Sequence, residues 1–291
     1  MSEPRAETNK AESAAPAEAA RAFLAELEQK ARLIRTPCGE GTMAWRLWGR
    51  GPALVLFHGG AGSWRHWVRN IELAARSRTV IAADLPGLGD STRAPDPVGA
   101  PAIAAIVAEG LDSVLGKGER YDIAGFSFGA VIAGLLAAQG KERVRSLTLV
   151  GSGGLGPPSR SVPLLKVRDK TGAERREAHR ANLARMMIFD PAKIDALALE
   201  IQEENSKRAR LNSGGMWISP VLLDALPLVR APVHAVWGEH EMADRTLLDR
   251  RIALMRQARA DADVTVVKGA GHWVFYEAAE EFNALLALFL E

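Results

Sequence analysis

A serine between two glycines marks the part of this chain that is best suited to chemistry. Gly125-Phe126-Ser127-Phe128-Gly129 reads G-x-S-x-G. A short, partly apolar run precedes it (residues 120–124), and a longer apolar run follows it (residues 130–138). A strand, a tight turn and a helix in this order hold a serine hydroxyl exposed at the end of a sheet, where it can attack a carbonyl. We therefore predict that Ser127 is a nucleophile.

A serine hydroxyl needs a base that removes its proton and an acid that orients the base. His272 lies in a glycine-rich loop directly after the last predicted strand, and we predict that it is the base. The acid should follow the preceding strand, and we assign it to Glu241, where the chain can turn back toward His272. Two other carboxylates lie close by. Glu239 should point away from the site, and Asp244 fits the N-cap of a helix.

Two backbone N–H groups should bind the oxyanion that forms when the serine attacks. One belongs to Phe128, the residue after the serine. We assign the other to Gly60 in the loop His58-Gly59-Gly60-Ala61-Gly62, whose glycines allow a close approach of the backbone. The loop lacks the spacing of a phosphate-binding turn. His58 is predicted to be a structural hydrogen-bonding residue at the end of a strand.

The segments that must position these residues alternate between strands and helices. Apolar strands are predicted at residues 53–57, 79–83, 144–150, 232–237 and 263–268. Helices are predicted at residues 64–75, 100–115, 244–259 and 277–290. This alternation favours a mostly parallel sheet with helices on both faces, so the predicted fold class is α/β. Residues 32–37 and 42–48 should add a hairpin through Gly39-Glu40-Gly41.

The alternation stops after Val150 and divides the chain. Residues 152–225 hold loops and charged helical segments but no predicted buried strand. We predict that they form a helical cap over the carboxyl edge of a core made of residues 31–151 and 226–291. Residues 1–30 are predicted to be an N-terminal extension that is partly mobile or helical.

The composition narrows the functional classes. The chain has 291 residues, of which 25% are charged, and its formal net charge is +2. This balance gives no reason to expect binding to nucleic acid or to a membrane surface. The single cysteine, Cys38, excludes an internal disulfide framework, and nothing calls for a metal or a cofactor. With no apolar run of transmembrane length and no signal-peptide pattern, we expect a cytoplasmic protein with a small-molecule substrate; a homo-oligomer is left open.

Taken together, these segments resemble the α/β-hydrolase superfamily over roughly residues 32–291. The motifs that carry the resemblance are His58-Gly59-Gly60, Asp84-Leu85-Pro86-Gly87-Leu88-Gly89-Asp90-Ser91, Gly125-Phe126-Ser127-Phe128-Gly129, Trp237-Gly238-Glu239 and Gly271-His272. The resemblance implies an α/β-hydrolase fold with a cap and a serine, acid and histidine triad. It is specific for the fold and much less specific for the substrate.

A narrower resemblance is to the meta-cleavage-product hydrolases, which cut carbon–carbon bonds in ring-fission products. It is carried by Trp64-x-x-Trp67-x-Arg69-Asn70-Ile71, by Asn182-Leu183, Met186-Met187 and Phe189-Asp190, and by Gly271-His272-Trp273 followed by Tyr276-Glu277 and Glu281-Phe282-Asn283. The resemblance implies that carbon–carbon bond hydrolysis is an alternative reaction for this chain.

The sequence departs from that family at positions that bind substrate. Phe126 stands where the family usually has an asparagine before the serine, and His66 stands where another asparagine binds substrate. A cap arginine that pairs with the substrate's carboxylate has no counterpart near residues 202–205, and the usual aspartate is Glu241. These departures count against a dienoate substrate and leave the hydrolytic residues in place.

Candidate substrate contacts are apolar or aromatic side chains and one histidine, each of which could equally belong to the core: Trp64, His66, Phe126, Phe128, Met187, Trp217 and Trp273. We predict a cofactor-independent serine hydrolase that acts through an acyl-enzyme on a small, fairly apolar ester, lactone or related acyl compound. Two alternatives remain: hydrolysis of a carbon–carbon bond in a vinylogous diketone, and ligand binding without catalysis on the same scaffold.

Overall fold

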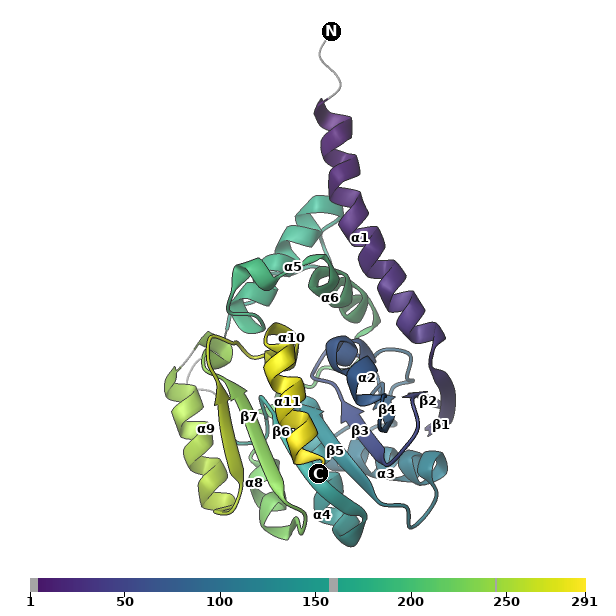
Figure 1. The fold of residues 1–291 in the computed structure, drawn as a ribbon, viewed down its shortest axis with the longest axis vertical. Helices are drawn as coiled ribbons and strands as arrows, with labels where there is room; N and C mark the ends of the chain where they lie inside the picture. Colours follow the sequence, from purple (N-terminus) through teal and green to yellow (C-terminus); the bar gives the residue numbers. More distant parts are fainter. Residues whose placement is uncertain (1–4, 157–161, 244) are drawn as a thin grey trace.

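The computed structural model describes residues 5–156, 162–243 and 245–291. Within these ranges the chain forms an eight-stranded sheet with the strand order β1-β2-β4-β3-β5-β6-β7-β8 (Figure 1). The strands are β1 (Arg32–Cys38), β2 (Gly41–Trp48), β3 (Ala53–Phe57), β4 (Thr79–Ala83), β5 (Tyr121–Phe126), β6 (Val144–Val150), β7 (Val233–Gly238) and β8 (Asp263–Val267). Strand β2 pairs antiparallel with β1 and β4, and the other neighbours are parallel. The predicted α/β fold class is confirmed.

The helices outside the segment between β6 and β7 are α1 (Arg5–Gln29), α2 (Val68–Ala74), α3 (Ala100–Leu115), α4 (Phe128–Gly140), α9 (Arg245–Ala258), α10 (Val274–Glu277) and α11 (Ala279–Phe289). Short 3₁₀ turns are η1 (Trp64–Trp67), η2 (Lys141–Arg143) and η5 (Glu241–Ala243). None of the helices described is both long and apolar enough to cross a bilayer.

The central strands are buried on both faces because successive side chains point to opposite sides of a sheet. In β3, Val55 and Phe57 belong to a core that packs against α3, α4 and α9. Leu54 and Leu56 belong to a second core, which packs against α2, α10 and α11. Burial of one such side chain stabilises the fold by about 1.5–3 kcal/mol. The continuous apolar pattern of β3 is therefore what two covered faces require.

The segment between β6 and β7, here called the insertion (residues 151–232), consists of helices and loops, without a strand, where it is described. It contains α5 (Gly172–Met186), α6 (Ala196–Arg208), α7 (Gly214–Trp217) and α8 (Val221–Ala225), with the turns η3 (Pro191–Lys193) and η4 (Leu226–Leu228). Figure 1 shows α5 and α6 beyond one end of the sheet, with α1 running alongside. The insertion thus lies at one end of the sheet.

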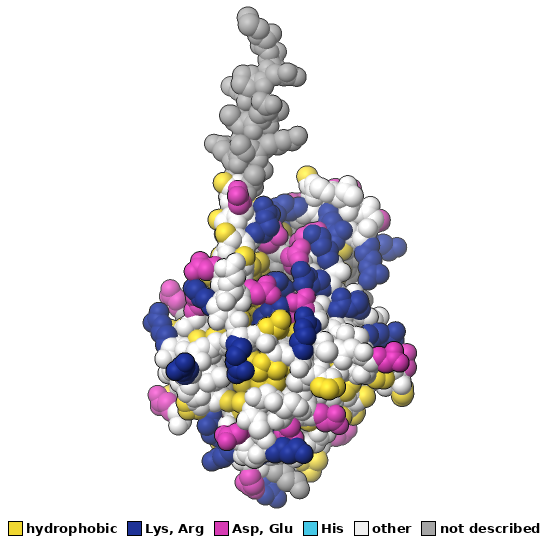
Figure 2. Space-filling view, turned by 90° about the vertical axis from the view of Figure 1, so that its right-hand side faces the viewer, with side chains coloured by type: hydrophobic (Ala, Val, Ile, Leu, Met, Phe, Trp, Pro, Cys, Tyr) yellow, Lys and Arg dark blue, Asp and Glu magenta, His cyan; other side chains and the backbone are white. Residues whose placement is uncertain are grey.

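Helix α1 links the N-terminal part of the chain to both the sheet and the insertion. Leu24 and Leu27 are buried, and Trp48 Nε1 in β2 donates to the carbonyl of Leu27 at 2.7 Å. Arg21 pairs with Glu200 of α6 at 3.3 Å. Residues 1–4, part of the predicted mobile extension, lie outside the described residues. On the face seen in Figure 2, acidic and basic side chains are intermingled around α1.

Candidate active site

Ser127 occupies a strained turn between β5 and α4. Its φ is 51°, in the left-handed region that residues with a side chain rarely adopt. Such strain persists only where the surroundings enforce it, and it concentrates at functional sites. The N–H of Ser127 donates to the carbonyl of Val150 at 2.8 Å, which fixes the turn against the end of β6. The serine is partly exposed, while the residues on both sides of it are buried.

The two glycines around the serine are required by packing. A Cβ on Gly125 would overlap the carbonyl oxygen of Gly129, and a Cβ on Gly129 would overlap the carbonyl oxygens of Phe57 and His58. The turn, the first turn of α4 and the end of β3 therefore touch backbone to backbone. This close approach explains the glycines of the G-x-S-x-G sequence.

The predicted base and acid are hydrogen-bonded to each other. His272 Nδ1 lies 2.7 Å from Glu241 Oε1, and both side chains are buried. The same carboxylate oxygen accepts from Arg251 Nη1 of α9 at 2.6 Å. Burial raises the pKa of Glu241, but the charges and hydrogen bonds of His272 and Arg251 outweigh burial and hold it below its ordinary value. An ionised Glu241 accepts a hydrogen bond from Nδ1–H, which leaves Nε2 of a neutral His272 as an acceptor.

The alternative acids are placed differently. Glu239 is partly exposed, and its Oε2 accepts from the N–H of Gly269 at 3.1 Å. Asp244, the predicted N-cap, lies outside the described residues. Of Glu239 and Glu241, only Glu241 bonds to His272. The loop that carries it is tightly bent, since Met242 has a φ of 48°.

Ser127 and His272 lie at the same edge of the sheet. The ring of Phe126, the residue before the serine, lies 4.8 Å from the imidazole of His272 between centroids. A Cβ on Gly151, which follows β6, would come within 2.9 Å of His272 Nδ1. No hydrogen bond joins Ser127 Oγ to His272 among the residues described. Such bonds are often long in unliganded enzymes and shorten when substrate binds.

The backbone around the serine offers N–H groups to an anion. Phe128 is the first residue of α4, and the first N–H groups of a helix have no intrahelical acceptor and lie at its positive end. The loop that carries Gly60 passes beside the serine, because a Cβ on Gly59 would lie 3.4 Å from Ser127 Cβ. Both predicted oxyanion donors thus belong to segments that border Ser127.

Two buried histidines support the loop around Gly60. Gly59 N donates to His66 Nδ1 at 3.3 Å, and Leu85 N donates to His58 Nε2 at 2.9 Å. Burial holds the pKa of His66 well below its ordinary value, and the charges of His58 and His272 add to this effect. His66 is therefore neutral and accepts at Nδ1. Both contacts are structural, and for His58 this agrees with the prediction.

The candidate substrate contacts fall into two groups. His66, Phe126 and Trp273 pack together near His272: the His66 ring lies 5.6 Å from Phe126 and 5.0 Å from Trp273. Trp64 instead packs against Trp48, with a centroid distance of 5.4 Å, and beneath two arginines. Its contacts are those of a core residue. The side chain of Trp217 lies outside the described part of the structure.

Met187 belongs to a small recess beside His272. The recess has a volume of about 20 Å³, and its lining comprises residues 184–189, His240, Gly271 and His272. This is room for about one water molecule. The ring of Phe189 stacks on His240 at 3.4 Å next to it. The insertion is thus in direct contact with the loop that carries His272.

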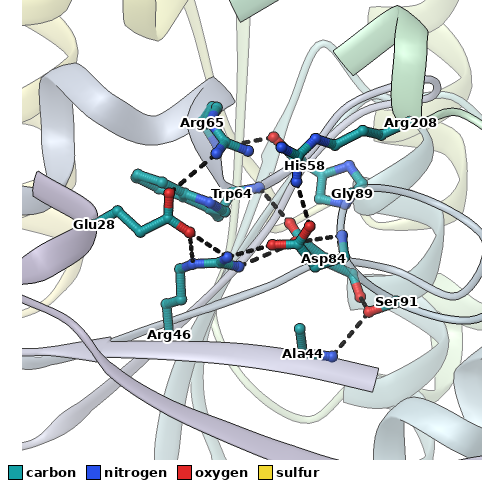
Figure 3. Close-up of polar contacts among 12 residues, drawn as sticks. Glu28, Ala44, Arg46, His58, Trp64, Arg65, Asp84, Gly89, Ser91 and Arg208 are labelled. Atoms are coloured by element: carbon teal, nitrogen blue, oxygen red, sulfur yellow. Dashed lines mark hydrogen bonds and ion pairs between the residues drawn. The ribbon is translucent and has the colours of Figure 1, made fainter. Parts of the chain in front are cut away.

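The loop Asp84–Ser91, one of the motifs that carry the resemblance, takes part in a network of ion pairs and hydrogen bonds. Figure 3 shows Arg46 of β2 lying between Glu28 and Asp84, with ion pairs to both. Asp84 also accepts from the N–H of Trp64 at 2.8 Å, and Asp90 pairs with Arg46 and with Arg208 of α6. The network fixes η1, which follows the loop of Gly60, and ties the insertion to the core.

For two residues near the site, the sequence predicts no function. Arg251 lies in α9, a helix with several arginines, and nothing in its spacing distinguishes it. Glu277 was part of the resemblance to the meta-cleavage-product hydrolases, but without a function. Its carboxylate accepts from the N–H of Gly271 at 2.7 Å, next to His272. Only the folded arrangement reveals either contact.

The comparisons with known proteins agree with this architecture. Residues 54–285 match the model of a family described as the alpha/beta hydrolase family. A 2-hydroxy-6-oxononadienedioate/2-hydroxy-6-oxononatrienedioate hydrolase from Burkholderia vietnamiensis is 31% identical over 82% of this chain and 86% of its own length. A dihydrolipoyllysine-residue acetyltransferase component of an acetoin cleaving system from Pseudomonas putida is 28% identical over 82% of this chain. The match spans 64% of that relative's length.

Solved structures share the fold. Carboxylesterase CesB from Bacillus subtilis superimposes with a TM-score of 0.72 at 18% identity, and the match covers 94% of this chain and 98% of the esterase. Meta-cleavage product hydrolases also occur among the relatives and the structures. Because the family model covers most of the chain, this protein belongs to the alpha/beta hydrolase family.

Proposed function

We propose that this hydrolase uses Ser127 as a nucleophile and acts through an acyl-enzyme on a small, fairly apolar ester, lactone or related acyl substrate. The observation that carries the proposal is the 2.7 Å hydrogen bond between buried His272 and Glu241, at the sheet edge where Ser127 occupies its strained turn. A base held in one tautomer at the sheet edge that carries a serine hydroxyl is the arrangement that nucleophilic catalysis requires.

In this mechanism His272 Nε2 takes the proton of Ser127 as Oγ attacks the substrate carbonyl. Glu241 holds the imidazole through Nδ1 and stabilises its charged form without becoming protonated. The N–H groups of Phe128 and Gly60 bind the oxyanion, and the loss of one such donor lowers kcat by about 10²–10³ in other enzymes. His272 then protonates the leaving group, and a water activated by the same imidazole hydrolyses the acyl-enzyme.

The surroundings of the triad support an apolar acyl group. Phe126, His66 and Trp273 lie close together beside His272, and His66 is neutral. We further propose that residues 152–225 act as a cap that excludes water from this space. The aromatic surfaces of these side chains favour an apolar acyl group.

The second candidate is hydrolysis of a carbon–carbon bond in a vinylogous diketone. The similarity to dienedioate and semialdehyde hydrolases, at 29–31% identity over more than four fifths of the chain, favours it. Phe126 argues against it, because a phenyl ring cannot supply the hydrogen bonds of the amide that it replaces.

Fluorophosphonate labelling with peptide mapping tests the nucleophile, and a substrate panel separates the two reactions. We expect label on Ser127, none on Ser127→Ala, and turnover of nitrophenyl esters without bleaching of a yellow ring-fission product. Rapid bleaching would instead establish carbon–carbon bond hydrolysis. An unlabelled Ser127 in folded protein, together with tight binding of an apolar acid, would favour a binding protein without catalysis.

A further inference from the structure

A buried carboxylate joins the loop of His272 to the insertion. Glu277 of α10 is only 3% exposed. Its Oε2 accepts from the N–H of Gly271 at 2.7 Å and from that of Phe189 at 3.0 Å, and its Oε1 accepts from the N–H of Asp190 at 2.7 Å. Three backbone donors from two segments that are far apart in the sequence therefore converge on one side chain.

A second link lies on the other side of His272. The N–H of Trp273 donates to the carbonyl of Met187 at 2.7 Å. Gly271 and Trp273 are the two neighbours of His272, so the residues on both sides of the proposed base are tied to residues 187–190. Space is also limited, because a Cβ on Gly271 would come within 2.8 Å of Phe189 N.

The carboxylate of Glu277 accepts these three backbone hydrogen bonds and forms no ion pair with any of the residues described. Lys193 lies close, but its Nζ donates to the backbone carbonyl of Glu277 and not to the carboxylate. A buried carboxylate is costly unless it is hydrogen-bonded, and bonds from N–H groups to an ionised acceptor are roughly twice as strong as neutral ones. The carboxylate therefore holds three donors in one fixed arrangement.

We propose that Glu277 is a positioning residue, whose carboxylate locks the loop of His272 to residues 187–190 of the insertion. The inference rests on the proposed function, because it assumes that His272 is the base. With the lock intact, the imidazole stays on its hydrogen bond to Glu241 and in reach of Ser127. Without it, the loop can shift away from that geometry, and a shift of about 1 Å is enough to lower a rate by about 10².

The first test compares two substitutions at contacts between the insertion and the core. In Glu277→Gln the amide keeps the shape of the side chain but presents an N–H to at least one backbone donor. In the control Asp195→Asn, the changed side chain bonds to Tyr276, to Arg69 and to the N–H of Ala198, and it has no hydrogen bond to Gly271 or Trp273. We expect Glu277→Gln to lower kcat and the rate of fluorophosphonate labelling by about 10–100-fold with KM changed less than about twofold, and Asp195→Asn to keep kcat within about twofold.

A spectroscopic measurement reports the lock directly. The proton between His272 Nδ1 and Glu241 should give a downfield proton resonance in the wild-type protein and in Asp195→Asn, and this resonance should be broadened or lost in Glu277→Gln. If Glu277→Gln does not fold, Glu277→Asp keeps the charge but shortens the reach, and we expect the same loss of kcat.

Wild-type kcat and resonance in a folded Glu277 variant would overturn the inference, as would an equal loss of kcat in Asp195→Asn. A failure of the proposed function looks different, because Ser127 of the wild-type protein would then remain unlabelled.

Discussion

At the scale of single residues, the contact between Glu241 and Arg251 accounts for the charge of the acid. A carboxyl group that is fully buried tends to be neutral, and a neutral acid would not hold the imidazolium of His272. Arg251 and His272 together offset the cost of burial and keep the pKa of Glu241 below its ordinary value. Glu241 is therefore ionised at neutral pH, as the proposed mechanism needs.

The role of Glu241 predicts a large effect of Glu241→Gln. The amide can donate to Nδ1, which selects the wrong tautomer of His272, and the corresponding change in a serine protease lowers kcat by about 10⁴. We expect a loss of about 10³–10⁴ in ester turnover. The matched control is Glu239→Gln, whose side chain contacts Gly269 near the surface and should leave kcat within about twofold. Similar losses in both variants would contradict the assignment.

The contact with Arg251 also predicts a pH dependence of stability. Because the pKa of Glu241 in the folded protein is below the ordinary 4.5, this group contributes stability above pH 4.5 that is lost as the pH falls through the lowered pKa. Arg251→Met removes one charge that lowers this pKa while burial remains, so the contribution should shrink and its loss should be complete at a higher pH.

Thermal unfolding from pH 3 to 8 measures this effect. We expect Arg251→Met to be less stable than the wild-type protein by about 3–5 kcal/mol at pH 7, since it leaves a buried charge with one partner fewer. Arg256→Met in the same helix changes an exposed side chain and serves as the control. Unfolding curves of Arg251→Met that follow those of the control at every pH would refute the prediction.

At the scale of the elements, the sequence predicts those helices and strands whose bounds follow from the local pattern of apolar residues. The strands at 79–83 and 144–150 and the helix at 100–115 have the predicted bounds, because each is a mostly apolar run flanked by polar residues or glycine. The predicted helix 64–75 is instead divided into η1 and α2. Asp84, distant in the sequence, binds the N–H of Trp64 and fixes its start. Long-range polar contacts of this kind leave no periodic signal.

The site shows the same division. That Ser127, Glu241 and His272 lie at one edge could be predicted because each lies in a segment that follows a strand, and strand ends of a parallel sheet meet at one edge. The contacts of Arg251 and Glu277 could not, because both side chains lie in helices and reach the site only through tertiary packing. Trp64 is the converse case, an aromatic residue near the site in sequence whose ring packs into the core.

The network around Asp84 joins several elements, so a substitution of Asp84 should lower the stability of the fold. Asp84→Asn replaces a buried carboxylate that binds Arg46 and the N–H groups of Trp64 and Asp90. Since Arg46 loses a buried partner, we expect the free energy of unfolding to fall by about 3 kcal/mol in urea. The control Asp96→Asn breaks an exposed pair with Arg93 and should cost less than about 1 kcal/mol. Equal costs would show that burial of the network is unimportant.

At the scale of the whole molecule, the insertion is held to the remainder of the chain at separate places. Glu277 ties it to the loop of His272, and Asp90 ties it through Arg208 to the loop after β4. Helix α1 forms a third contact, because Arg21 pairs with Glu200 while Leu27 anchors the helix on β2. If these contacts are independent, loosening α1 should lower stability without displacing His272.

Leu27→Ala tests this independence. Leu27 is 1% exposed and packs in the core on the α2 face of the sheet, so its truncation should lower the free energy of unfolding by about 2–5 kcal/mol. Because the lock through Glu277 is unchanged, kcat of the folded variant should stay within about twofold of the wild-type value. Leu33→Ala, at a side chain that is 48% exposed on β1, should change neither quantity appreciably. Urea unfolding and ester kinetics on the same preparations separate the two effects. A fall in kcat that follows the fall in stability would mean that α1, the insertion and the loop of His272 move as one unit.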